Sequence, residues 1–246
     1  MSIANEIERL QQAKASIKKS IENKGIEVGD ITLEQYAGKI DEISGTSQKP
    51  SKLEYIEIVG NNCFDTGYIH KSNTNIEAKF RVSNVRRSTS GWSMLFGARK
   101  VSYTSNAFGF FTNFNGQNRF GYCRTGNEAV GTGLYTQDLT LKTEGKKVTY
   151  GYSIYNYSIT TTGTLDNGVN NLLIGAINSG EANKITLDVS TADTLRIYYF
   201  KIFEDSTLVK HFVPYRNEKG IIGLLDLVSN EFIKPFNDFI VGADID

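Results

Sequence analysis

Histidines, cysteines and paired carboxylates are the side chains that most often carry out catalysis, and this chain has few of them. Its two histidines, His70 and His211, are isolated in the sequence, and no GxSxG serine motif is present to pair with either one. Cys63 and Cys123 lie far apart and have no CxxC or Cys/His companion, so the common zinc and redox motifs are absent. We therefore expect both cysteines to be buried free thiols and both histidines to be structural.

The carboxylates are also poorly arranged for glycoside hydrolysis, which needs two of them facing each other across a cleft. Glu204 and Asp205 are adjacent at an expected hairpin tip, so their side chains should project in different directions. Glu54 and Glu57 fall on opposite faces of a regular strand, and Glu77 stands alone. We predict that the protein is not an enzyme and binds no cofactor. A glycoside hydrolase remains the weaker alternative, because catalytic groups can converge from distant strands.

The stretch 106–124 is the best candidate for ligand binding. It interleaves aromatic residues with Asn, Gln and Arg around an expected hairpin, and this mixture suits sugars because rings contact the apolar side of a pyranose while amides bind its hydroxyls. The candidate ligand-binding residues are Asn113, Asn115, Asn118 and Arg119. The same composition fits a buried strand beside an exposed turn, in which Phe108 and Phe110 share one face and Phe111 lies on the other.

Calcium is bound by oxygen ligands from loops, and two oxygen-rich loops occur at 60–66 and 166–171. Neither has the spacing of a known calcium loop. We predict no metal site.

The elements that must position these residues are mostly short strands separated by turn signals such as Asn115-Gly116 and Ser179-Gly180. This rhythm predicts a mainly β protein in which two antiparallel sheets pack together, and it argues against a βαβ arrangement. The expected strands are 53–59, 74–82, 92–99, 107–112, 118–123, 147–155, 158–165, 171–176, 184–189, 195–204, 208–214, 221–226 and 231–234.

The N-terminal residues have a different period, that of a helical heptad repeat. The residues predicted to form an oligomerisation seam are Ile3, Ile7, Leu10, Lys14, Ile17 and Ile21. Isoleucine at both the a and d positions shifts coiled coils from dimers toward trimers or tetramers, so we predict a homotrimer. A second amphipathic helix should follow, with Thr32 as its cap and Gln35 completing a capping box. The alternative is a helical pair that packs on its own sandwich and has no oligomeric role.

A polar stretch rich in small residues, from Ser44 to Ser51, separates the helices from the strands. We therefore predict a helical oligomerisation and docking segment at 1–45, a linker at 46–52 and a β-sandwich at 53–246.

The charges balance, with 27 Lys and Arg against 27 Asp and Glu, so no net field attracts nucleic acid. No apolar run approaches the roughly 18 residues needed to span a bilayer, and the N-terminus has no secretory signal pattern. We expect neither nucleic-acid binding nor membrane insertion, and synthesis in a cytoplasm.

Three blocks, at 195–232, 53–69 and 92–99, together resemble the concanavalin A-like (LamG-like) jelly-roll domains of structural proteins of tailed bacteriophages. The segment 17–43 resembles the leader segments that assemble phage tail and fibre proteins onto the particle. The resemblance implies an antiparallel jelly-roll β-sandwich preceded by a coiled-coil or hairpin segment. It also implies that Asp65 and Gly67 keep a strand-entry turn.

The function that this resemblance implies is that of a virion structural protein, a fibre, appendage or decoration subunit located in the virion. Its N-terminal helices would trimerise and bind other virion proteins, and its lectin-like sandwich would contact host cell-surface glycans. A stand-alone carbohydrate-binding or adhesion module is the alternative. The same fold hosts glycoside hydrolases in some families, which is the enzymatic alternative already considered.

Overall fold

The computed structural model describes most of the chain, and the statements below concern those residues. They are 3–23, 26–32, 35–36, 38–40, 50–59, 62–83, 92–99, 107–113, 118–123, 127–130, 137–152, 155–178, 194–236 and 240–245. The chain divides into an N-terminal unit that ends at Pro50 and a larger unit that begins at Ser51. Each unit is described by itself.

The N-terminal unit contains one long helix, α1 (Ile3–Glu22). Its sequence is rich in good helix formers, with the acidic Glu6 in the first turn and the basic Lys19 in the last turn, where each complements the helix dipole. The chain then turns back, and Val28 and Tyr36 form a small apolar cluster with Ile21. The backbone N–H of Thr32 donates to Oε1 of Gln35 over 2.8 Å, which is half of the expected capping box.

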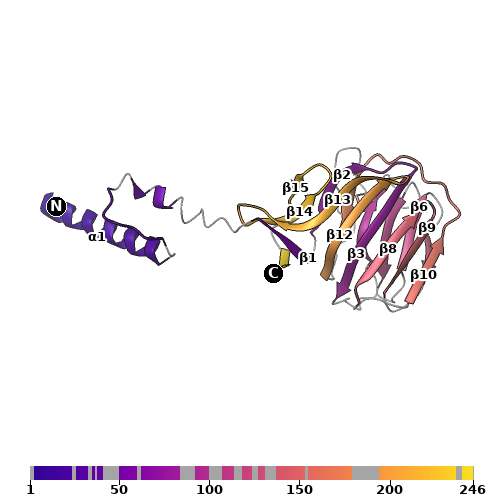
Figure 1. Cartoon of the computed structure of the whole chain (residues 1–246), viewed down its shortest axis with the longest axis horizontal. Coiled ribbons are helices and arrows are strands. Elements are labelled where there is room, and N and C mark those ends of the chain that lie inside the picture. The colour runs from indigo at the N-terminus through magenta and orange to yellow at the C-terminus, as the bar shows by residue number, and fades with distance from the viewer. Residues whose placement is uncertain are drawn as a thin grey trace. The chain divides into compact units, whose positions relative to one another are not determined.

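The larger unit is a β-sandwich of two antiparallel sheets, so the mainly β prediction is confirmed (Figure 1). Sheet 1 has, in spatial order, β10 (Tyr155–Thr160), β9 (Lys147–Tyr152), β8 (Leu139–Glu144), β3 (Thr74–Ser83), β12 (Thr194–Glu204), β1 (Ser51–Val59), β13 (Thr207–Arg216), β14 (Ile222–Asp226) and β15 (Glu231–Ile233), with β16 (Ile240–Asp244) paired to β1. Sheet 2 has β2 (Phe64–Ile69), β11 (Asn171–Ile174), β4 (Trp92–Ala98), β5 (Ala107–Asn113), β6 (Asn118–Cys123) and β7 (Asn127–Val130).

The core lies between the two sheets and is largely aromatic. The ring centroids of Phe200 in sheet 1 and Phe96 in sheet 2 are 5.4 Å apart, and those of Tyr150 and Phe110 are 5.3 Å apart. Phe108 and Phe110 are buried on one face of β5, whereas Phe111 on the other face is only partly buried, as period-two alternation predicts. The inner faces of both sheets therefore contribute to a single core.

Several expected elements have different bounds in the structure. The strand expected at 147–155 ends at Tyr152, and β10 begins at Tyr155, because the chain reverses there into a hairpin. Four strands, β2, β7, β8 and β16, were not expected, and the strand expected at 184–189 lies outside the described residues. The linker expected at 46–52 ends earlier, since Ser51 and Lys52 belong to β1 and pair with the end of β13.

Candidate functional site

The ligand-binding residues expected in 106–124 lie on a β-hairpin, as β5 and β6 pair in antiparallel register with Phe111 opposite Arg119 and Thr112 opposite Asn118. Asn115 lies outside the described residues, and so do the side chains of Asn113, Asn118 and Arg119. The structure therefore gives the backbone of this hairpin but not the geometry of its side chains. Its role in binding stays a prediction.

Side-chain oxygens of the two oxygen-rich loops accept hydrogen bonds from nearby backbone and side-chain N–H groups. Oδ1 of Asp65 accepts a hydrogen bond from the N–H of Gly67 over 2.9 Å, and Oδ2 accepts one from Nδ2 of Asn171. Gly67 has a φ of +64°, which a side chain would disfavour. Oδ1 of Asn167 accepts from the N–H of Ser72 over 3.0 Å. These oxygens form turns, and the described residues contain no His, Cys, Asp and Glu cluster suited to a metal.

The two histidines lie in different environments. His70 is 1% exposed, its ring centroid is 5.3 Å from that of Phe108, and neither ring nitrogen has a hydrogen-bond partner among the described residues. Burial lowers its pKa to about 4. His211 is half-buried opposite Lys201 on sheet 1, and burial together with this lysine lowers its pKa. Cys63 is a buried free thiol, as expected, whereas the side chain of Cys123 lies outside the described residues.

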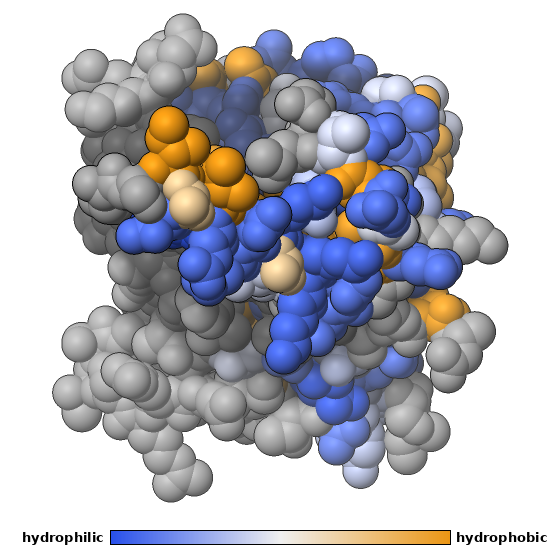
Figure 2. Space-filling model, turned by 90° about the vertical axis from the view of Figure 1, so that its left-hand side faces the viewer, coloured by the Kyte–Doolittle hydropathy of each residue, from blue (hydrophilic) through white to orange (hydrophobic). Residues whose placement is uncertain are grey.

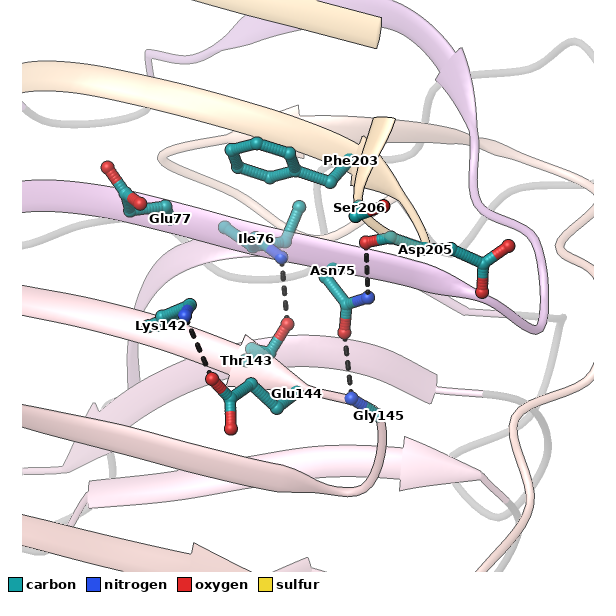
Figure 3. Close-up of a pocket in the computed structure, with 10 residues that line it drawn as sticks. All are labelled: Asn75, Ile76, Glu77, Lys142, Thr143, Glu144, Gly145, Phe203, Asp205 and Ser206. Atoms are coloured by element: carbon teal, nitrogen blue, oxygen red, sulfur yellow. Dashed lines mark hydrogen bonds and ion pairs between the residues drawn. The ribbon is translucent and has the colours of Figure 1, made fainter. Parts of the chain in front are cut away.

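A pocket of about 450 Å³ lies at one end of sheet 1 (Figure 3). It lies among β3, β8, the turn that follows β8, and the turn between β12 and β13. Its lining residues are Asn75, Ile76, Glu77, Lys142, Thr143, Glu144, Gly145, Phe203, Asp205 and Ser206. The volume falls within the usual range of small-molecule sites.

Asn75 ties together the two turns that frame this pocket (Figure 3). Its Nδ2 donates to the carbonyl oxygen of Asp205 over 3.2 Å, and its Oδ1 accepts from the N–H of Gly145 over 2.7 Å. Beside it, the N–H of Ile76 donates to Oγ1 of Thr143 over 2.8 Å. The pocket walls are therefore cross-linked by hydrogen bonds between segments that are distant in sequence.

Most charges in the pocket are paired. Nζ of Lys142 lies 2.8 Å from Oε1 of Glu144, and this hydrogen bond lowers the pKa of Glu144. A glycosidase acid needs the opposite shift, so Glu144 is not suited to that role. Glu77 is paired with Lys201 over 2.7 Å. Among the described residues, the half-buried Phe203 ring has no aromatic or cationic partner and the Ser206 hydroxyl has no hydrogen bond.

The outer face of sheet 1 continues from the pocket as a network of aromatic and charged side chains. The hydroxyl of Tyr198 donates to Oδ1 of Asp138 over 2.8 Å, and Nε of Arg81 donates to the same oxygen over 2.7 Å. Arg196 lies 3.7 Å above the ring of Tyr55. The pattern is a cross-strand ladder that orders the solvent face of the sheet.

Sequence reasoning missed the pocket because its two halves come from separate hairpins. The turn at Glu204 and Asp205 was expected, but nothing in the sequence places it beside the turn at Gly145. The sequence does contain a signal for one wall of the pocket, because apolar and polar residues alternate in 139–144. Leu139 and Leu141 face inward and Lys142 faces outward, and this alternation predicts strand β8.

The N-terminal seam is an exposed apolar stripe on α1. The exposed fractions are 82% for Ile3, 51% for Ile7, 52% for Leu10 and 40% for Ile17. Ile21 differs, since it is 2% exposed and packs within its own unit. The coloured residues on the face shown in Figure 2 are mostly hydrophilic, with hydrophobic groups gathered in small patches. No helix in the described part of the chain is long and apolar enough to cross a membrane.

No known family profile matches the chain, and no curated protein does. Among solved structures, the K499G mutant of NanB sialidase from Streptococcus pneumoniae is 17% identical with a TM-score of 0.36, covering 62% of this chain and 26% of that one. A Trypanosoma rangeli sialidase mutant with trans-sialidase activity is 13% identical with a TM-score of 0.33, covering 53% and 20%. Scytalido-glutamic peptidase is 10% identical with a TM-score of 0.35, covering 79% and 98%.

The chain thus spans about a quarter or less of the length of these sialidases. At these TM-scores the similarities carry no functional argument.

Proposed function

We propose that the protein is a structural subunit of a bacteriophage virion, a fibre, appendage or decoration protein. In this proposal α1 forms a trimeric coiled coil and attaches the chain to other virion proteins, while a concanavalin A-like jelly-roll sandwich contacts glycans on the host surface. The sequence resemblance motivates the phage assignment. The exposed stripe on α1 is the single structural observation that supports assembly.

That stripe is unfavourable in a free chain. Fully burying one isoleucine or leucine side chain stabilises a protein by about 1.5–3 kcal/mol, so four exposed ones in heptad register leave a large driving force for helix association. A second copy of the same stripe is the complementary surface, because each Ile knob fits the hole between the same residues of a neighbour.

Contacts within the N-terminal unit limit the part of the stripe that is open to other copies. Ile21 is buried beside Val28 and Tyr36, and Nζ of Lys14 lies 6.0 Å from the Tyr36 ring. In this proposal the following segment of the same chain covers Ile21 and lies beside Lys14, and the exposed side chains of Ile3, Ile7, Leu10 and Ile17 are left for other copies. Most of the stability of helices in proteins comes from packing, and the contact of Ile21 with Val28 and Tyr36 stabilises the last turn of α1.

Light scattering on the full chain tests the assembly. We expect a mass about three times 27.4 kDa for the intact chain, and a monomer for the double variant Ile7→Glu with Leu10→Glu, because two charges would be buried in the seam. Gln12→Glu places a charge on the opposite face of α1 and should leave the trimer intact. A monomeric intact chain at micromolar concentration would refute the assembly and favour the stand-alone adhesion module.

A further inference from the structure

We infer that the pocket among β3, β8 and the β12–β13 turn binds one residue of a neutral oligosaccharide. This inference rests on one part of the proposed function, the contact between the sandwich and host glycans, and it names the site and the class of glycan for that contact. Its support is the chemistry of the lining, and it does not depend on the trimer.

The first support is an aromatic wall without a partner. Phe203 is half-buried on β12, and Figure 3 shows its ring above the strand that carries Ile76 and Glu77. Among the described residues no ring or cation packs on it, unlike Tyr55 and Tyr198, whose rings have Arg196 and Lys79 against them. A ring left open beside polar groups suits the apolar C–H face of a pyranose.

The second support is the mixture of hydrogen-bonding groups around that ring. The Ser206 hydroxyl both donates and accepts, the carboxylates of Glu77 and Asp205 accept, and Lys142 donates. Sugar hydroxyls are donors and acceptors at once, so they can use all of these groups. A purely apolar ligand would cover the Ser206 hydroxyl without giving it a hydrogen-bond partner, at a cost of about 1–3 kcal/mol if that hydroxyl is buried.

The third support is the charge balance, which selects a neutral ligand. Glu77 is paired with Lys201 and Glu144 with Lys142, so among the described residues Asp205 is the one lining carboxylate without an ion pair. Its Oδ2 instead accepts from Nδ2 of Asn73 over 2.8 Å. A sugar phosphate or sugar carboxylate would meet no unpaired cation here and would be repelled by Asp205.

The frame of the pocket is preorganised, and it excludes strand addition by a peptide. The N–H of Asp205, at a φ of 53°, donates to the carbonyl of Asn73 over 2.9 Å, and Asn75 links this turn to Gly145. Strands β3, β8 and β12 each have partners on both sides, so no free strand edge borders the pocket. A rigid site loses little conformational entropy when a ligand binds, so preorganisation increases the affinity.

Saturation-transfer NMR on the full chain tests the inference. The probes are the methyl glycosides of glucose, galactose, mannose, rhamnose and N-acetylglucosamine, with N-acetylneuraminic acid and choline as charged comparisons. We expect transfer to at least one neutral glycoside. Phe203→Ala should raise the dissociation constant about tenfold through loss of the ring contact, and Asp205→Asn by a similar factor through loss of a charged acceptor.

Tyr155→Ala is the matched control, since it removes an exposed aromatic ring from β10 of the same sheet outside the pocket, and should change the dissociation constant less than twofold. Asp205→Asn keeps a residue type that tolerates positive φ, so it serves if Phe203→Ala fails to fold. Transfer to none of the neutral probes, binding unaffected by both pocket variants, or preference for a charged probe would overturn the inference. Light scattering on the same samples reports the trimer separately.

Discussion

His70 lies in an unusual environment for a histidine. It was expected to be structural, and the structure buries it without giving either ring nitrogen a hydrogen-bond partner among the described residues. The space around it is tight, because a Cβ on Gly168 would lie 2.5 Å from its Nδ1. Such a site holds the neutral imidazole and penalises the charged one, since desolvation has no compensating contact.

This environment predicts a pH-dependent stability. The pKa of His70 falls from about 6.5 unfolded to about 4 folded, so between these values the unfolded chain binds more protons and is favoured as the pH falls. Its effect is absent above the unfolded pKa and complete below the folded one. Between pH 7 and pH 4.5 we expect the intact chain to lose about 2 kcal/mol more of its free energy of unfolding than His70→Leu loses, as measured by urea unfolding.

His211→Gln is the control for this measurement, because His211 is only half-buried and should account for less of the pH dependence. If His70→Leu and the intact chain lose the same stability over this range, His70 is not the buried neutral group described.

Among the elements, β4, β5 and β6 share an arrangement of glycines. Gly97 pairs with Gly109 and Gly109 with Gly121, which places three glycines in one row across sheet 2. The row faces away from the aromatic core, since Phe96, Phe108 and Phe120 beside it are buried in the core. Ile177 and Met94 pack directly over Gly97. The glycines therefore let a second apolar layer approach the backbone of the sheet.

We expect Gly109→Ala to destabilise the sandwich by about 1–3 kcal/mol, because its Cβ would lie 2.7 Å from the carbonyl oxygen of Phe96 and 3.0 Å from Cα of Gly97. Gly29→Ala is the matched control, since nothing lies within 4 Å of its Cβ, and it should change the free energy of unfolding by less than about 0.5 kcal/mol. Equal stability of the two variants in urea would contradict close packing on the glycine row.

Strands with a long alternation of apolar and polar residues could be predicted from the sequence. Segments that become strands only by pairing with a neighbouring strand could not. Ile76, Ala78, Phe80 and Val82 alternate with polar residues, so β3 follows from period two alone. Ser51 and Lys52 are polar and enter β1 only because Arg216 and Tyr215 pair with them. The pocket is of the second kind, since it depends on the register that sets β3 beside β8 and β12.

At the scale of the whole molecule, the proposal joins a weak site to a trimer. A pocket that holds a single sugar residue makes few contacts, and several copies on one particle raise the effective affinity without any new contact. The seam on α1 and the pocket on sheet 1 are in separate units, so each can be altered without touching the other.

This separation makes a prediction about avidity. On a sensor surface that carries many copies of the methyl glycoside found to bind, the Ile7→Glu with Leu10→Glu variant should dissociate faster and bind about a hundredfold more weakly than the intact chain. Its affinity for the free glycoside should stay within twofold, because the pocket is unchanged. Surface plasmon resonance measures both quantities. Equal retention of the monomeric variant and the intact chain would show that assembly through α1 contributes nothing to surface binding, and that each sandwich acts alone.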